Sequence, residues 1–227
     1  MENRFIRQQE LVDQDKLSSL SVTIVGCGAV GSFTALSLAK MGIRQLTLID
    51  HDEVSIENLP NQFFREEDMD RKKVVACMEI LELFDSGVKV FPQPRPYVKG
   101  KLESDIVISS VDSMQVRKAV WQSVLRDKKA RLLIDPRMAA HVVQVYSVIP
   151  GDPSSTKAYE STIVSDNQAL PDRCTARSII YTVLPLAALI CRQIALFANG
   201  EWVEPGITLD LKTLSLIKGG INSWAGK

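Results

Sequence analysis

The sequence is short of the features that mark several common classes of protein. It holds four cysteines in 227 residues, widely spaced and with no Cys-x-x-Cys pair. Structural zinc sites with four thiolates are built from such pairs, so we expect no structural zinc. Isolated cysteines are also typical of reduced thiols, which favours a cytoplasmic location.

An excess of charge of one sign is also lacking, because 27 basic residues offset 27 acidic ones. No run of like charges is long enough to act as a nucleic-acid tail, so we expect no nucleic-acid partner. The opening stretch, residues 1–16, is charged and polar, which is unlike a secretory signal.

Long hydrophobic runs are scarce. The most apolar segment, residues 178–191, is interrupted by Pro185 and followed by Arg192. A membrane crossing needs about 20 apolar residues, so this segment is too short, and we predict a core helix and no membrane span.

What the sequence does contain is a glycine motif between an expected strand, residues 21–25, and an expected helix, residues 31–41. In the order Gly26-x-Gly28-x-x-Gly31, the first glycine allows a tight turn and the second lets the backbone approach a ligand. The third lets the helix pack closely against the strand. The N–H groups of the first helical turn then point at an anion, so the motif predicts a nucleotide site.

Polar side chains follow the next expected strand, residues 45–50. Asp50 ends this strand about 20 residues after the motif, where an acidic side chain can accept hydrogen bonds from a ribose. Asp52, Asn58 and Gln62 come shortly after it, in a stretch where many dinucleotide folds begin a helix. These side chains extend the predicted nucleotide site.

Strands and helices alternate along the rest of the chain, which predicts an α/β fold with a doubly wound, Rossmann-like, mostly parallel sheet and helices on both faces. The further expected strands are 88–91, 105–111, 131–135 and 142–149, and the further expected helices are 3–13, 71–84, 113–126 and 175–198. We expect a single domain over residues 1–227. Its parts are an N-terminal helix (1–20), a nucleotide-binding core (21–149), a mobile crossover loop (150–174), and a helix with a C-terminal β-hairpin (175–227).

Cations and a further acid fall near the same strand ends. Lys72 and Lys73 open the helix 71–84, and Asp112 follows the buried strand 105–111, where open α/β sheets bind ligands. Carboxylate, lysine and amide groups together suit a metal–triphosphate better than a nicotinamide ring. Simpler readings remain open for each: a solvated helix face for the lysines, a helix N-cap for Asp112, and a turn for Asn58.

Together these residues resemble the ThiF/MoeB/HesA superfamily, the ubiquitin-activating-enzyme-like adenylyltransferases, in a compact and zinc-free form of the kind expected in bacteria. The resemblance is strongest over residues 3–125. The matching positions are Arg4-Phe5-Ile6-Arg7-Gln8, the three motif glycines, Asp50, Asp52, Val54, Asn58, Leu59, Lys73, Asp112 and Arg117.

The resemblance implies an ATP-dependent activity. Enzymes of this kind adenylate the C-terminal glycine carboxylate of a ubiquitin-like or sulfur-carrier protein and release pyrophosphate. It further implies that Mg²⁺ is bound at Asp112, and that Arg7 acts in the neighbouring subunit of a homodimer. It also implies that Asp50 contacts the ribose. The phosphates would be contacted by Arg7, Asn58 and Lys73. The other residues implied to bind the nucleotide are Gly26, Gly28, Gly31, Asp52 and Gln62.

One position departs from the family pattern. An arginine expected to touch the phosphates is replaced by Asn61. Arg65 or Arg137 could supply the missing positive charge, although either could also be an ordinary surface arginine.

A cysteine follows the long polar stretch. Cys174, in Pro171-Asp-Arg-Cys-Thr-Ala-Arg177, resembles the thioester cysteine of ubiquitin-activating enzymes, which pass their carrier to a conjugating-type enzyme. A helix N-terminus beside arginines lowers the pKa of a thiol and makes it more nucleophilic. The alternative is a cysteine that simply begins a helix. Cys27, Cys77 and Cys191 are interpreted as structural.

Two other functions remain open from the sequence. A nicotinamide-dependent oxidoreductase of similar fold would need a proton donor, and the chain has only two histidines, His51 and His141. His51 directly follows Asp50, which is expected to bind the ribose, so it is not an obvious proton donor for the nicotinamide reaction. A non-catalytic nucleotide-binding scaffold is the other alternative, supported by Asn61 in place of arginine.

Overall fold

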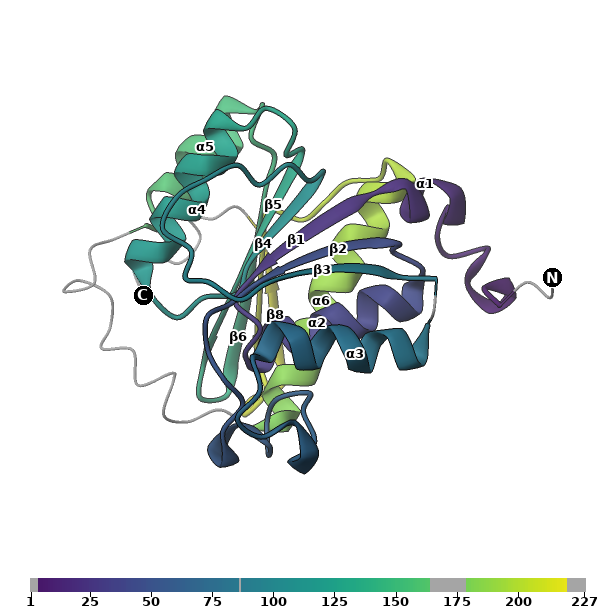
Figure 1. Ribbon diagram of the computed structural model, residues 1–227. Coiled ribbons are helices and arrows are strands. Elements are labelled where there is room, and N and C mark those ends of the chain that lie inside the picture. The colour runs from purple at the N-terminus through teal and green to yellow at the C-terminus, as the bar shows by residue number, and fades with distance from the viewer. Residues whose placement is uncertain (1–3, 86, 164–178, 220–227) are drawn as a thin grey trace.

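A computed structural model describes residues 4–85, 87–163 and 179–219 of the chain. Its centre is an eight-stranded sheet with the order β3-β2-β1-β4-β5-β6-β7-β8 (Figure 1). The strands are β1 (Ser21–Val25), β2 (Gln45–Ile49), β3 (Lys89–Gln93), β4 (Ile106–Ser109), β5 (Leu132–Ala139), β6 (Val142–Val148), β7 (Gly206–Asp210) and β8 (Ser215–Lys218).

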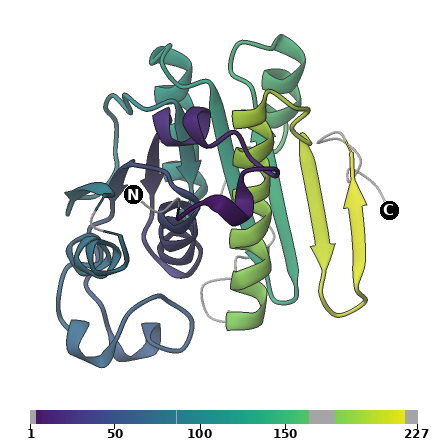
Figure 2. The same ribbon diagram turned by 90° about the vertical axis from the view of Figure 1, so that its right-hand side faces the viewer.

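Pairing divides the sheet into two parts. The strands from β3 through β5 are parallel, whereas β5 to β8 pair antiparallel. The two yellow strands at the edge of Figure 2, β7 and β8, form the expected C-terminal hairpin. The predicted α/β fold with a mostly parallel sheet is therefore confirmed.

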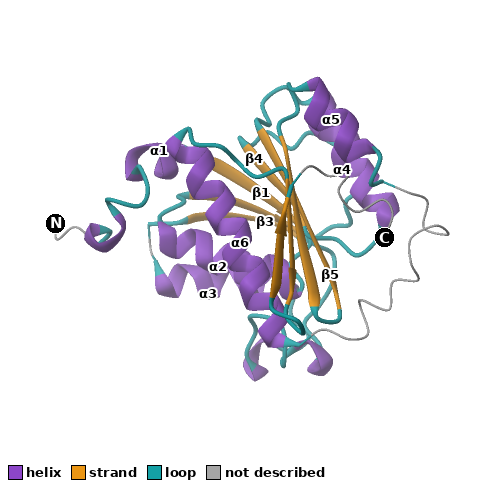
Figure 3. Cartoon of the chain, turned by 180° about the vertical axis from the view of Figure 1, so that it is seen from behind, coloured by secondary structure: helices purple, strands orange, loops and turns teal. Residues whose placement is uncertain are grey.

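Helices cover both faces of the sheet (Figure 3). One face carries α1 (Gln14–Ser19), α2 (Ala29–Met41), α3 (Lys73–Phe84) and α6 (Ile180–Asn199). The other face carries α4 (Met114–Arg126) and α5 (Pro153–Glu160). Short 3₁₀ turns lie at Ile6–Gln8, Ile56–Asn58 and Glu66–Asp68.

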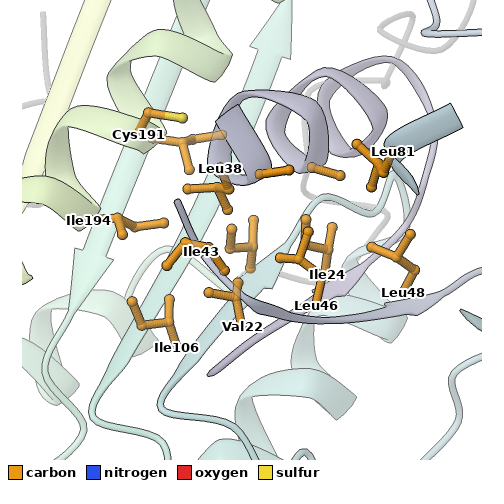
Figure 4. Packing of buried hydrophobic residues seen from close by; sticks show 14 of the residues in the cluster. Val22, Ile24, Leu38, Ile43, Leu46, Leu48, Leu81, Ile106, Cys191 and Ile194 are labelled. Atoms are coloured by element: carbon orange, nitrogen blue, oxygen red, sulfur yellow. The ribbon is translucent and has the colours of Figure 1, made fainter. Parts of the chain in front are cut away.

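The main core lies between the sheet and the α2, α3 and α6 layer. Branched side chains of β1 and β2, such as Ile24 and Leu48, meet Leu38 of α2 and Ile194 of α6 (Figure 4). A second cluster around Trp121 packs α4 and α5 on the opposite face. Because the central strands β1 and β4 are buried on both faces, they are rich in consecutive apolar residues in the sequence.

The strand order predicts a binding crevice at the carboxyl ends of the parallel strands. From β1 the chain moves outward to β2 and β3, and then returns to β4 on the other side of β1. The connections that leave β1 and β4 therefore diverge, and ligands of open α/β sheets bind at such a switch point, beyond the carboxyl ends of the strands.

The expected N-terminal helix over residues 3–13 is wrong in position. The chain forms only a 3₁₀ turn at Ile6–Gln8, and the helix α1 begins at Gln14. The cause is Asp13, whose side chain accepts a hydrogen bond from the backbone N–H of Lys16 at 3.1 Å. Such an N-cap starts a helix after the aspartate and not before it.

The expected loop over residues 150–174 is also partly wrong. Its first half contains α5, which begins at Pro153 after the N-cap Asp152. The Asp152 carboxylate accepts from the N–H groups of Ser154 and Ser155, and proline is favoured in the first turn of a helix. The remainder of that expectation lies outside the described residues.

Helix α6 is longer than its apolar run suggested. It continues past Arg192 to Asn199, so its 20 residues are long and apolar enough to cross a membrane by length and composition alone. The argument from shortness was therefore wrong. In the structure 44% of its most apolar window is buried, and α6 packs against α2 and β6 as the predicted core helix.

Candidate functional site

A cavity of about 780 Å³ opens at the carboxyl ends of β1, β2 and β4. Its walls bring together most of the residues that the sequence predicted to bind a nucleotide. These are Gly26, Gly28, Asp50, Asp52, Asn58, Gln62, Lys73 and Asp112.

The three motif glycines have different structural roles. A Cβ on Gly31 would lie 1.9 Å from the carbonyl oxygen of Gly26, so the helix could not pack against the turn. Gly26 has a φ of +94°, and its Cβ would lie 2.4 Å from the Ser110 carbonyl oxygen. At Gly28 a Cβ would meet only Gln62, at 3.9 Å. Gly28 is therefore not required by packing, and its missing side chain leaves space in the cavity.

Asp50 holds the glycine turn in shape. Its Oδ2 accepts from the Cys27 N–H at 2.6 Å, and its Oδ1 accepts from the Asp52 N–H at 2.9 Å. The carboxylate therefore sits at the end of β2 with its orientation set by two backbone donors. This fixed orientation suits a hydrogen-bond acceptor for a ligand hydroxyl group.

Lys73 is a buried cation on the wall of the site. Its side chain is 7% exposed, and its Nζ lies 2.9 Å from Oδ2 of Asp52. Its neighbour Lys72 is 43% exposed and pairs with Glu53 on the surface. The solvated-face interpretation is therefore right for Lys72 and wrong for Lys73.

The loop after β2 supplies amide groups. Asn58 both lines the cavity and closes a local turn, because its Oδ1 accepts from the Ser55 N–H at 3.2 Å. The buried Oε1 of Gln62 has no hydrogen-bond partner among the described residues. A buried acceptor of this kind is costly unless a ligand or water satisfies it, which fits a polar ligand in the cavity.

Asp112 is an exposed residue on the cavity wall. Helix α4 is capped instead by Ser113, whose hydroxyl accepts from the Val116 N–H at 3.4 Å. The N-cap interpretation of Asp112 is therefore wrong, and its carboxylate is not used to begin the helix. A solvated carboxylate on the wall of the predicted nucleotide site is a suitable ligand for Mg²⁺.

Another group on the wall could also hold a cation. Oxygen or nitrogen atoms of Asp50, His51 and Asp52 lie within 4.8 Å of one another. The ammonium group of Lys73 already lies against Asp52, which offsets part of this negative charge.

Tyr97 is a cavity residue that the sequence did not suggest. Burial raises the pKa of its phenol, and its hydroxyl donates to the Gly100 carbonyl oxygen at 3.2 Å. The segment after β3 carries no motif, so only the fold brings this ring to the cavity.

A buried polar network lies along the β5 side of the cavity. Asp135 is fully buried and pairs with the guanidinium groups of Arg117 and Arg137, the latter at 2.9 Å. The hydroxyl of Tyr159 on α5 donates to the same carboxylate at 2.9 Å, and burial raises the pKa of this phenol. Both arginines line the cavity.

Arg65 and Arg137, the two arginines that could supply the positive charge missing at Asn61, lie in different surroundings. Arg137 is on the cavity wall, whereas Arg65 forms two hydrogen bonds of 3.0 Å from its guanidinium to the buried Asp68. Burial alone would raise the pKa of Asp68, but the hydrogen bonds from Arg65 outweigh it and the pKa is lowered. Arg65 is thus held in the loop, outside the lining of the cavity in the described chain.

The remaining predicted site residues lie elsewhere. Arg7 is exposed in the 3₁₀ turn ahead of α1 and is not among the described residues that line the cavity. Cys174 lies outside the described residues.

Three other cysteines are buried thiols. The pKa of Cys27 is raised well above its usual range by a hydrogen bond with Cys77 and by burial, and burial raises that of Cys191 to about 12. The environments of Cys27 and Cys191 favour the protonated thiol, and the burial of all three cysteines supports a structural role for them.

Comparisons with curated proteins find relatives named as a modifier-activating enzyme and as an adenylyltransferase and sulfurtransferase. A ubiquitin-like modifier-activating enzyme 5 from Dictyostelium discoideum is 28% identical over 168 residues, covering 66% of this chain and 44% of the relative. The adenylyltransferase and sulfurtransferase MOCS3-1 of Zea mays is 31% identical over 110 residues, covering 46% of this chain and 24% of the relative. The chain therefore spans less than half of the length of these proteins.

Solved structures share the fold. The crystal structure of E. coli MccB with ATP is 20% identical, with a TM-score of 0.79, and the match covers 97% of this chain and 72% of that one. PaaA is 19% identical, also with a TM-score of 0.79, and covers 96% of this chain and 82% of its own. A family model described as the ThiF family matches residues 3–222. The chain with this glycine turn, buried lysine and cavity belongs to the ThiF family.

Proposed function

We propose that this chain uses ATP to adenylate the C-terminal glycine carboxylate of a ubiquitin-like or sulfur-carrier protein. One observation carries the proposal: a single cavity gathers the glycine turn, Asp50, Lys73 and Asp112. The relatives named as modifier-activating enzyme and adenylyltransferase support the same reaction.

In the proposed step a carboxylate oxygen forms a bond to the α-phosphorus of ATP. The bond from that phosphorus to the bridging oxygen breaks, and pyrophosphate leaves with the electron pair. Two anions must approach each other, so the chain mainly has to align them and offset their charge. Gly28 gives the nucleotide room, Asp50 accepts from the ribose, and Lys73 offsets phosphate charge.

Asp112 is the proposed magnesium-binding residue. The donor set fits a hard cation, because its exposed carboxylate lines the same cavity as the phosphate-binding turn. Mg²⁺ bound there supplies positive charge against the triphosphate.

Exchange of labelled pyrophosphate into ATP tests the proposal. We expect exchange that requires Mg²⁺ and a carrier ending in glycine, and that disappears when the terminal carboxylate is blocked as an amide. An oxidoreductase would instead bind nicotinamide nucleotides tightly without Mg²⁺, and a scaffold would bind ATP without exchange. Absence of exchange with every glycine-ended carrier encoded beside this chain would count against adenylation.

We further propose a homodimer in which Arg7 completes the site of the neighbouring subunit. Arg7 is exposed in the 3₁₀ turn Ile6–Gln8 ahead of α1, and it is not among the described residues that line the cavity. Helix α6 also exposes apolar side chains, with Tyr181 43% and Leu184 48% exposed, and a second copy could cover them.

Mixing two inactive variants tests the composite site. In a dimer of Arg7→Ala with Lys73→Ala, one of the two sites keeps both residues. Random exchange of subunits makes about half of the dimers mixed, so we expect about a quarter of the wild-type exchange rate. Each variant alone should be nearly inactive. No recovery on mixing, with sedimentation showing exchanged dimers, would show that Arg7 does not act across subunits.

A thioester step at Cys174 is a further proposal, supported by the Pro-x-x-Cys-Thr-x-Arg pattern. The Cys174 thiolate would attack the acyl-adenylate, form a thioester and release AMP, and a conjugating-type enzyme would then receive the carrier. We expect a carrier adduct on a non-reducing gel that thiols remove and that Cys174→Ala abolishes. Exchange of pyrophosphate should persist in that variant. An adduct that survives the substitution would exclude Cys174 as the acceptor.

A further inference from the structure

The buried network on the β5 side of the cavity joins two guanidinium groups to one carboxylate among the described residues. Asp135 supplies this carboxylate, and it faces the guanidinium groups of Arg117 and Arg137. The side chains of Asp135 and Arg117 are 0% and 6% exposed, so solvent screens this charge poorly. Both guanidinium groups belong to residues that line the cavity, where a guanidinium can pair with a bound anion.

Arg137 is the member of the network best placed to meet a ligand. Its side chain is 16% exposed and lines the cavity, and its guanidinium lies 4.6 Å from the centre of the Tyr146 ring. It donates four hydrogen bonds, to Asp135 and to the hydroxyl and carbonyl oxygens of Thr162. A guanidinium has five N–H groups, so one on Nη1 is left over among the described contacts.

Strand order separates Arg137 from the part of the cavity that suits the nucleotide. Asp50 follows β2 and the glycine turn follows β1, whereas Arg137 lies in β5, beyond β4 in the order β2-β1-β4-β5. Neighbouring strands are about 4.8 Å apart, so β5 is about 14 Å from β2. The register pairs Ile134 of β5 with Ile108 of β4, so Arg137 lies past the carboxyl end of β4.

We infer that Arg137 binds the terminal carboxylate of the acyl substrate and holds it at the end of the cavity opposite the ribose. This inference rests on the proposed adenylation and names a residue that selects a free carboxylate. Asp135 and Tyr159 act as positioning residues, because they hold the guanidinium without lining the cavity themselves in the described chain. The carboxylate would take the remaining Nη1 donor, while Asp135 and Thr162 keep the other four.

Binding of a short fluorescent peptide ending in Gly-Gly tests this inference directly. The peptide is prepared as the free acid and as the C-terminal amide, and its anisotropy is measured with a non-hydrolysable ATP analogue present. A charge-assisted hydrogen bond predicts that the wild-type protein binds the acid roughly tenfold more tightly than the amide. In Arg137→Gln the two affinities should become equal, while the affinity for the ATP analogue stays within about twofold.

Two further variants separate binding from folding. Arg137→Lys keeps the charge and should retain part of the preference for the acid. Arg65→Gln is the matched control, because Arg65 also pairs with a buried aspartate but lies outside the cavity lining of the described chain, and it should keep the full preference.

Several results would overturn the inference. The first is that the wild-type protein binds the acid and the amide equally well. The second is that Arg137→Gln keeps the full preference for the acid. The third is that Arg137→Gln loses affinity for the ATP analogue, which would mean that Arg137 binds a phosphate. Pyrophosphate exchange is measured separately. If exchange fails while the preference for the acid holds, adenylation is rejected and carboxylate binding by Arg137 stands.

Discussion

Lys73→Ala is expected to lower carrier-dependent pyrophosphate exchange by roughly 10²–10³-fold, the usual effect of removing one group that stabilises transition-state charge. Lys73 is a buried cation of the cavity, with its Nζ 2.9 Å from Asp52. Its ammonium group can offset phosphate charge without solvent screening, which is why its removal should have a large effect.

Folding should be little affected by the same change. The partner Asp52 is 50% exposed, so water can solvate its carboxylate once the ammonium group is gone. We therefore expect the thermal denaturation midpoint of Lys73→Ala to stay close to that of the wild-type protein. A large fall in this midpoint would mean that loss of exchange reports misfolding.

Lys72→Ala is the matched control for this experiment. It removes the preceding lysine, whose ion pair with Glu53 lies on the surface and outside the cavity lining of the described residues. Exchange should be unchanged in this variant. Equal losses in the two variants would contradict a specific role for Lys73 and would indicate a general effect of charge near the cavity.

The place of the site was predictable because it depends on local patterns. The glycine motif, Asp50 and Asp112 each follow an apolar run, and parallel strands bring their carboxyl ends to one edge of a sheet. The distinction between Lys72 and Lys73 was not predictable in this way, because it depends on which side of α3 packs against the sheet.

The polar network around Asp135 depends on contacts between distant segments. Tyr159 reaches Asp135 from 24 residues away, and α5, which carries it, was not expected. Contacts between distant segments and within the loop also decide which of Arg65 and Arg137 reaches the cavity. Asp68 holds Arg65 in its own loop, and the antiparallel extension of β5 carries Arg137 to the cavity.

Helix boundaries failed where a short polar side chain competed with periodicity. Asp13 and Asp152 each accept backbone N–H groups and begin a helix that the apolar pattern did not indicate. The expected end of the helix 175–198, by contrast, is close to the observed end at Asn199, because a single exposed arginine such as Arg192 can remain in water without ending a buried helix.

Gly31→Ala is expected to destabilise the fold, whereas Gly28→Ala is expected to leave the fold intact and to weaken ATP binding. A methyl group on Gly31 would lie 1.9 Å from a carbonyl oxygen of the turn, so the turn or the helix must move. Such overpacking costs about 1–3 kcal/mol or more. For a chain of this size each kcal/mol lowers the denaturation midpoint by about 2–4 °C.

Gly28→Ala should leave the fold intact, because its methyl group would meet only Gln62, at 3.9 Å, and φ at this residue is −75°. The methyl group would instead occupy space beside the turn that we assign to the phosphates. We expect roughly tenfold or greater weakening of ATP binding by calorimetry, equivalent to about 1.4 kcal/mol.

Gly151→Ala completes the comparison as a control. A Cβ at Gly151 meets nothing within 4 Å, and the residue is not among the described residues that line the cavity. This variant should match the wild-type protein in both denaturation and ATP binding. If Gly28→Ala also binds ATP like the wild-type protein, the nucleotide does not approach the turn, and the phosphate site must lie elsewhere in the cavity. The three variants thus separate the glycine that the fold requires from the glycine that the ligand requires.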